Sequence, residues 1–270
     1  MQVIRRIGEV AAAGLTAVVL VVGGAAPARA VTPQQAKVAI EVAAKAYELY
    51  SRYVNGAMTL DEATGKIIDA IEAAQTAIMA HVDAIAAANV RACARSAVID
   101  VADVGSMSPD TLQSFARDAT DCVTLAEGLI HAAVDKTVIN QLAFTANAVG
   151  PIALFARTHA GLTTPALRST LAALNTTVVT KLTPPCDATP LWGDSSGGFV
   201  EVALRCVAFN GQQGHDSVIR RLTAGQPLPR FDYTYATTVA MKNTAYEQAK
   251  VVLAALGTVW VAVCCVWPAP

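Results

Sequence analysis

Apolar residues recur at alternating steps of three and four along one stretch of the chain, and this heptad spacing constrains the fold more than any other feature. A side chain returns to the same face of an α-helix after three or four residues, so the pattern predicts a helix with one buried stripe. The stripe is short and rich in alanine. Its members are Leu112, Phe115, Ala119, Cys122, Ala126, Leu129 and Ala133.

Helical periodicity extends on both sides of this stretch. Thr59 and Glu62 form a capping box, from which we expect a second helix to continue to about Asp103. Gly150-Pro151 predicts a kink in a later helix. The expected helices span residues 33–54, 59–103, 109–133, 137–157 and 164–182.

Composition agrees with a helical interior. The chain is 54% hydrophobic but only 6% aromatic, so its core must consist mainly of alanine, valine, leucine and isoleucine. Alanine is the best helix former, and small side chains let helices approach closely. We therefore expect a mainly α protein: a helical bundle over residues 31–182 that contains a long antiparallel helical hairpin.

The six cysteines indicate disulfides if the chain is exported. A hairpin folded about the midpoint between Met107 and Ser108 places Cys93 opposite Cys122, and both lie on the buried stripes of their helices. A bridge between them is therefore predicted. The even count and the absence of C-x-x-C spacing leave a zinc site with little support.

Residues 183–235 differ from the rest of the chain because proline and glycine accumulate there. Phe199 to Phe209 alternates between apolar and polar residues, which predicts a short strand, with Phe231 to Val239 as its partner. A second bridge, between Cys186 and Cys206, would then tie the glycine-rich loop to the strand. We expect a small disulfide-held β cap here.

The first thirty residues have the pattern of a signal peptide. Arg5 and Arg6 precede an uncharged apolar run, and Ala28-Arg29-Ala30 is a small-x-small cleavage signal. We expect Sec-type export, cleavage after Ala30, and a secreted bacterial protein. Without this segment the chain has 17 basic and 20 acidic side chains, a net charge of -3, which gives no indication of nucleic-acid binding.

Two groups of residues contain side chains of the types found at chemical sites. Residues 193–198 resemble the nucleophile loop of chymotrypsin-like serine proteases over a few positions only, and a mainly helical chain is the wrong scaffold for that family. A different hydrolase would use Ser195 or Ser196 with His215 as base, beside Asp194 or Asp216. The structural alternative is that these residues form turns.

The hairpin register also places His81 near His131 and Asp135, a set that resembles metal ligands. Helical phase turns His131 away from the apolar stripe, because it lies two residues from Leu129, about 200° round the helix. We therefore predict no metal and no cofactor, and exposed or half-buried histidines.

The last 20 residues contain the most apolar segment, Val251 to Trp267, which has no charged residue. A core helix that packs back onto the bundle is the favoured interpretation, within a C-terminal region 236–270. A membrane anchor and a membrane-inserting element, as in helical pore-forming toxins, are the alternatives. The pairing of Cys264 and Cys265 stays open.

No coherent catalytic constellation emerges from these patterns. We therefore expect a secreted, non-catalytic helical protein with a structural or interaction role, whose partner is another protein or a component of the cell envelope. A membrane-active protein that inserts Val251 to Trp267 and a hydrolase based on Ser195 or Ser196 with His215 are the alternatives.

Overall fold

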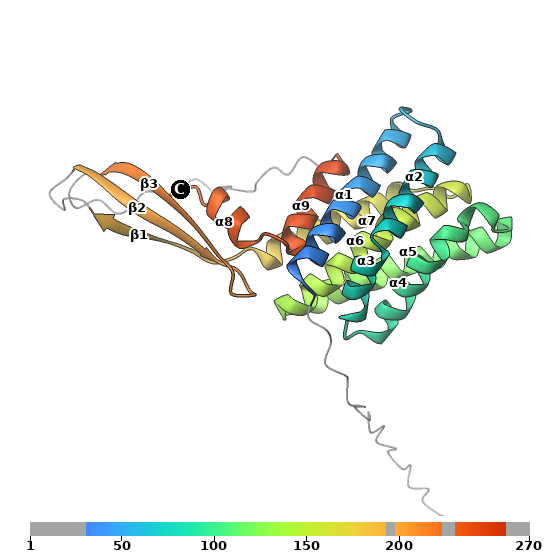
Figure 1. Cartoon of the computed structure of the whole chain (residues 1–270), viewed down its shortest axis with the longest axis horizontal. Helices are drawn as coiled ribbons and strands as arrows, with labels where there is room; N and C mark the ends of the chain where they lie inside the picture. The colour runs from blue at the N-terminus through green and yellow to red at the C-terminus, as the bar shows by residue number, and fades with distance from the viewer. Residues whose placement is uncertain (1–30, 193–197, 223–229, 258–270) are drawn as a thin grey trace, which may run out of the picture.

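The computed structural model describes residues 31–192, 198–222 and 230–257. It confirms the mainly α class, with one three-stranded antiparallel sheet. A body of packed helices carries the sheet as an arm that projects from one end (Figure 1). The expected signal peptide, residues 1–30, lies outside the described residues.

Helices from both ends of the described chain form the body, because α9 packs against α1, α6 and α7. The elements of the body are α1 (Pro33–Val54), α2 (Leu60–Ala73), α3 (Gln75–Asp83), α4 (Ala88–Asp100), the 3₁₀ helix η1 (Val101–Ser106), α5 (Pro109–Ala132), α6 (Lys136–His159), α7 (Pro165–Leu182) and α9 (Ala245–Ala255).

Local capping fixes where several of these helices begin. Thr32 forms both halves of a capping box with Gln35 at the start of α1. Thr59 accepts a hydrogen bond from the backbone N–H of Glu62 at the start of α2. Ser108 caps α5 in the same way. A side-chain oxygen at these positions satisfies an N–H group that has no partner within the helix, so each start was predictable from local sequence.

Helix α6 is the centre of the body. It is the one described helix that is long and apolar enough to cross a membrane, and 78% of its most apolar window is buried inside the protein. It continues through the predicted kink at Gly150-Pro151. The Tyr47 side chain of α1 packs directly over Gly150, so a β-carbon at that position would collide with it. The apolar character of α6 is therefore that of a core helix.

The prediction of a single helix over residues 59–103 is wrong. The chain breaks after Ala73 and again after Asp83, which gives α2, α3 and α4, followed by η1. No glycine or proline marks either break. Helices α3 and α4 both pack on α6, but α3 also packs on α1 and α4 on α5, so tertiary contacts redirect the chain against its local helix propensity. The hairpin is correspondingly shorter, and the strongest packing partner of α5 is α6.

The disulfide predicted between the two helices of this hairpin is present. A disulfide joins Cys93 on α4 to Cys122 on α5, with the two Cα atoms 5.7 Å apart. Cys122 is buried in the larger hydrophobic cluster of the body, and Cys93 packs against the same cluster. The pairing follows from the symmetric distance of the two residues from the turn between the helices.

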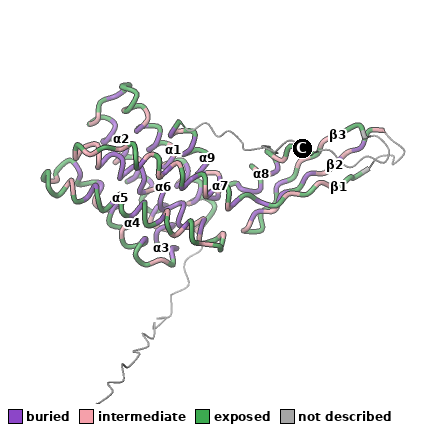
Figure 2. Tube along the Cα trace, turned by 180° about the vertical axis from the view of Figure 1, so that it is seen from behind, coloured by how far each residue is buried: buried purple, intermediate pink, exposed green. Residues whose placement is uncertain are grey.

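The arm consists of β1 (Cys186–Trp192), β2 (Gly198–Val207) and β3 (Gln213–Leu222), in the order β1-β2-β3. Its root is the end nearest the body, where a disulfide joins the paired residues Cys186 and Cys206. Its outer end is the end where Gly198 pairs with Leu222. Figure 2 shows buried residues filling the body and alternating with exposed residues along the strands of the arm.

The predicted partner of the central strand is wrong. The partner strands are β1 and β3, and residues within Phe231 to Val239 form helix α8 (Thr234–Ala240) instead. Threonine and valine favour strands, but here contacts with the sheet stabilise a helix instead. In the structure α8 packs on the sheet beside Gly214, where a β-carbon would meet backbone atoms of Ala236 and Ala240. A glycine in β3 thus makes room for a helix.

The C-terminal part of the described chain, helix α9, packs on the body. Val252 and Leu253 of α9 are buried. Gln248 of the same helix lies in a buried amide network, where it accepts a hydrogen bond from Asn147, which also exchanges hydrogen bonds with Asn175. Residues 258–270, with Cys264 and Cys265, lie outside the described residues.

Candidate functional site

The residues proposed for a hydrolase lie only partly within the described chain. His215 and Asp216 are neighbours on β3, so their side chains lie on opposite faces of the sheet. His215 pairs with Arg205 near the root of the arm.

Ser195 and Ser196 lie outside the described residues. The described part of the chain therefore contains the proposed base but neither of the proposed nucleophiles.

The two histidines of the possible metal set are also separated. His131 is exposed and lies 3.3 Å from a carboxylate oxygen of Glu127 on the same helix. His81 is buried, with 4% of its surface exposed, and its ring stacks on Phe144 with the centroids 4.0 Å apart. Among the described residues no group of three potential ligands is placed to hold a metal ion.

The burial of His81 differs from the exposed or half-buried position expected from sequence. Its spacing from Ile78 and Ile85, at three and four residues, was the signal that would have placed it on the buried stripe. Burial lowers the pKa of His81 to about 4, so the ring is neutral at pH 7.

His159 forms the one described contact that resembles an activated hydroxyl. Its Nε2 lies 2.6 Å from Oγ1 of Thr64, which in turn donates a hydrogen bond to the carbonyl of Leu60. A hydroxyl has one proton, so when Thr64 donates to Leu60 it accepts from the imidazole, and the roles in the contact with His159 depend on the tautomer of that ring. The contact ties α2 to the end of α6.

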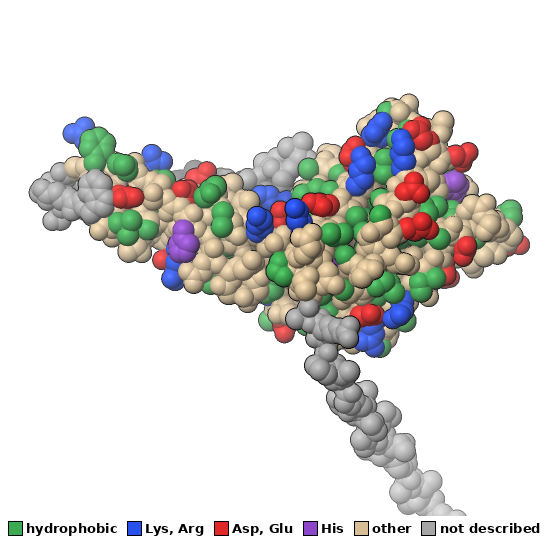
Figure 3. Space-filling model, viewed as in Figure 1, with side chains coloured by type: hydrophobic (Ala, Val, Ile, Leu, Met, Phe, Trp, Pro, Cys, Tyr) green, Lys and Arg blue, Asp and Glu red, His purple; other side chains and the backbone are tan. Residues whose placement is uncertain are grey.

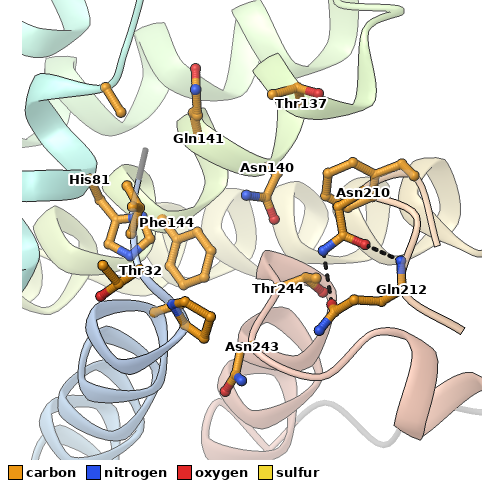
Figure 4. A pocket seen from close by; sticks show the side chains of 15 residues that line it. Thr32, His81, Thr137, Asn140, Gln141, Phe144, Asn210, Gln212, Asn243 and Thr244 are labelled. Carbon is orange, nitrogen blue, oxygen red and sulfur yellow. Dashed lines mark hydrogen bonds between the residues drawn. The ribbon is translucent and has the colours of Figure 1, made fainter. Parts of the chain in front are cut away.

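A pocket of about 400 Å³ lies where the arm joins the body. Its volume is within the range of small-molecule sites. Figure 4 shows the rings of His81 and Phe144 on one side and the β2–β3 turn on the opposite side. The described lining residues are Val31, Thr32, Pro33, Ala36, His81, Ala84, Thr137, Asn140, Gln141, Phe144, Phe209, Asn210, Gln212, Asn243 and Thr244.

Carboxamides dominate this lining. It contains five asparagine or glutamine side chains and two phenylalanines, and none of its described members is Asp, Glu, Lys or Arg. Asn243 has a positive φ of 59°, an uncommon conformation for a residue other than glycine. Hereafter we call this site the junction pocket.

A second candidate site is the open face of the arm. Cys186 and Cys206 face α8, and Phe231 and Tyr233 pack on the small cluster of Val200, Val202 and Leu204. These contacts cover one face of the sheet. The residues that alternate with them, including Phe199 and Ile219, form the other face and are exposed by 64% and 59%.

Comparison of the chain with protein-family models, with curated proteins and with solved structures found no match. The candidate sites are therefore assigned from their own geometry.

Proposed function

We propose that the chain is an exported, non-catalytic interaction protein that uses the open face of the arm to contact another protein of the cell exterior or envelope. The observation that carries the proposal is the exposed apolar pair Phe199 and Ile219 at the outer end of an arm held away from the body. The two intramolecular disulfides are compatible with an extracellular location. The signal-like segment that ends at Ala30 supports Sec-type export.

The register explains why these side chains act as one surface. Phe199 pairs with Arg221, and Glu201 pairs with Ile219, so Phe199 and Ile219 are diagonal neighbours on the same face. Leu191 at the end of β1 is also exposed, by 57%. Hydrophobic and arginine side chains gather at this end of the arm (Figure 3). Large apolar residues in contact with water and beside each other are typical of interaction surfaces.

The chemistry of the partner follows from the same residues. Arg221 pairs with Phe199 on the open face and is exposed, whereas Arg220 pairs with Val200 and lies on the opposite face. Aromatic residues and arginine are enriched at the energetic centres of protein interfaces. We infer a partner surface that offers an apolar pocket beside acidic groups, rather than a substrate that is chemically changed.

Site-specific photo-crosslinking tests this proposal. A photoreactive phenylalanine analogue at position 199 should give one discrete protein adduct in the cells that export the chain. The matched control is the same analogue at Tyr235, an aromatic residue of α8 that is 63% exposed and lies away from the open face. The adduct from position 199 should disappear with Ile219→Asp, while the protein remains folded by circular dichroism.

Two results would contradict the proposal. Equal labelling from positions 199 and 235, or none from 199 in a folded, exported protein, would remove the open face as an interaction surface. Turnover of ester, peptide or glycoside substrates by the purified protein would reject the non-catalytic role.

A further inference from the structure

We propose that the junction pocket is a binding site for a small neutral saccharide. The inference does not depend on the partner of the arm. Three properties of the described lining carry it: hydrogen-bonding groups that the protein leaves unused, the half-buried aromatic ring of Phe209, and no Asp, Glu, Lys or Arg side chain.

Several carboxamide groups of the junction pocket have no partner among the described residues. Asn140 uses its oxygen to accept a hydrogen bond from the backbone N–H of Ala245, which leaves its NH₂ group free. Gln212 accepts from Asn210 and keeps its own NH₂ group. The side chains of Gln141 and Asn243 make no hydrogen bond within the described chain. Each free amide offers donors or an acceptor to a ligand.

His81 lines the same pocket with a buried ring that is 4% exposed. Its Nε2 atom makes no hydrogen bond with any described residue, and that atom is itself enclosed by the protein. The groups of the lining that are open to a ligand are therefore the carboxamides.

An anion is not the ligand that the junction pocket favours, although three helices begin beside it. The N–H groups at those starts already have acceptors: Gln35 donates to Thr32, Thr137 donates to Asp135, and Ala245 donates to Asn140. The carboxylate of Asp135 also offsets the positive end of the α6 dipole. With no lysine or arginine in the described lining, a charged ligand would lose its hydration without gaining a counter-ion.

A saccharide matches the remaining chemistry. Its hydroxyl groups both donate and accept, as carboxamides do, so one amide can serve two neighbouring hydroxyls. Its ring also has an apolar C–H face, for which the half-buried ring of Phe209 provides an aromatic surface. Pockets of this kind combine apolar walls with a few polar groups that fix orientation.

Ligand-observed NMR and calorimetry with the purified exported protein test the inference. The probes are glucose, N-acetylglucosamine, trehalose and maltose, with glucuronate and glucosamine as charged counterparts of similar ring geometry. We expect at least one neutral sugar to bind, and glucuronate and glucosamine to bind at least tenfold more weakly than glucose.

Two pocket variants locate the binding. Asn243→Gly removes the carboxamide and suits the positive φ of the backbone, and Gln141→Ala removes an amide that makes no hydrogen bond in the protein. Each should weaken binding by roughly tenfold, in line with the loss of one or two hydrogen bonds. Gln113→Ala, which removes a half-buried glutamine of α5 outside the pocket, should leave affinity unchanged.

The inference is overturned if none of the four neutral sugars binds at millimolar concentration. Preferential binding of glucuronate or glucosamine would reject a neutral ligand. Binding that is unchanged in both Asn243→Gly and Gln141→Ala would place the sugar elsewhere on the protein.

Discussion

Lys181 shows how one side chain can complete a helix that is distant in sequence. Its ammonium group donates hydrogen bonds to the carbonyls of Ile130, His131 and Ala133, at 3.0, 2.6 and 2.9 Å. The last carbonyls of a helix have no partner within the helix, and they carry the negative end of its dipole. Lys181 on α7 therefore caps the C-terminus of α5.

Removing this charge should destabilise the body. For Lys181→Met we expect a loss of about 1.5–3 kcal/mol in the free energy of unfolding, because hydrogen bonds to charged groups are worth that much and the carbonyls lose their partner. Urea denaturation measures it. Lys136→Met is the matched control, since Lys136 donates one longer bond, of 3.3 Å, to Thr183. A loss in Lys181→Met no larger than in this control would reject the capping role.

His81 should make stability depend on pH. Its pKa is about 4 in the folded protein and about 6.5 in the unfolded chain, so the unfolded chain binds more protons between these values. The free energy of unfolding should therefore fall as pH is lowered from 6.5 toward 4, by at most about 3 kcal/mol from this residue. His81→Phe keeps the aromatic contact with Phe144 and should remove that part of the slope. The free energy of unfolding is measured by urea denaturation across this pH range. If it changed equally with pH in the parent and in His81→Phe, His81 would not be the cause.

At the scale of elements, Gly214 decides whether α8 can lie on the sheet. A β-carbon there would meet the backbone carbonyl of Ala236 and the backbone nitrogen of Ala240. Backbone atoms in a helix cannot move aside as a flexible side chain can, so Gly214→Ala should cost several kcal/mol or detach α8. Proteolysis within residues 230–245 would report detachment.

Replacing a glycine that lacks such contacts should have the opposite effect on the free energy of unfolding. Nothing lies within 4 Å of a β-carbon built at Gly65, in the interior of α2. Gly65→Ala should stabilise the protein by about 0.5–1 kcal/mol, because alanine loses less conformational entropy in a helix. Similar effects of the two substitutions would mean that α8 does not pack on Gly214.

The elements that were predictable from sequence are those set by local chemistry. The capping box of Thr59 and Glu62 predicts the start of α2, and the heptad stripe predicts the extent of α5. The breaks after Ala73 and Asp83 were not predictable, because no glycine or proline marks them and they depend on packing against other helices. The strand β3 was missed because its apolar residues Val218 and Ile219 are adjacent and do not alternate clearly.

The same distinction holds for the candidate sites. The sequence points to Ser195, Ser196 and His215 because their side chains are of types used in catalysis, and Ser195 and Ser196 lie outside the described residues. Strand geometry places the side chains of His215 and Asp216 on opposite faces of β3, which residue types alone do not reveal. The junction pocket was missed because its amides come from segments far apart in the chain, such as Asn140 and Gln212. Neutral amides have no spacing rule comparable to that of metal ligands or a catalytic triad.

At the scale of the whole molecule, the body and the arm share a core only at the root. One buried cluster contains Cys206, Ala208 and Ala240 together with residues of α6, α7 and α9. The cluster farther along the sheet is small, with Val200, Val202 and Leu204 as its buried members. The body therefore has an extensive interior of its own, whereas the outer part of the arm relies on strand pairing and on the bridge at its root.

The two disulfides should accordingly support different parts of the molecule. They join residues 29 and 20 positions apart, and closing loops of these lengths is worth roughly 3 to 4 kcal/mol each in the chain-entropy model. Replacing Cys93 and Cys122 by serine should lower the free energy of unfolding of the body by about that amount, as followed by the helical circular dichroism signal in urea. Replacing Cys186 and Cys206 should instead expose residues 186–222 to proteolysis, with a smaller effect on the helical transition, because the helices keep their own core. If the arm variant lowered the helical transition as much as the body variant, the arm and the body would form one cooperative unit, and the arm could not act as a separate interaction element.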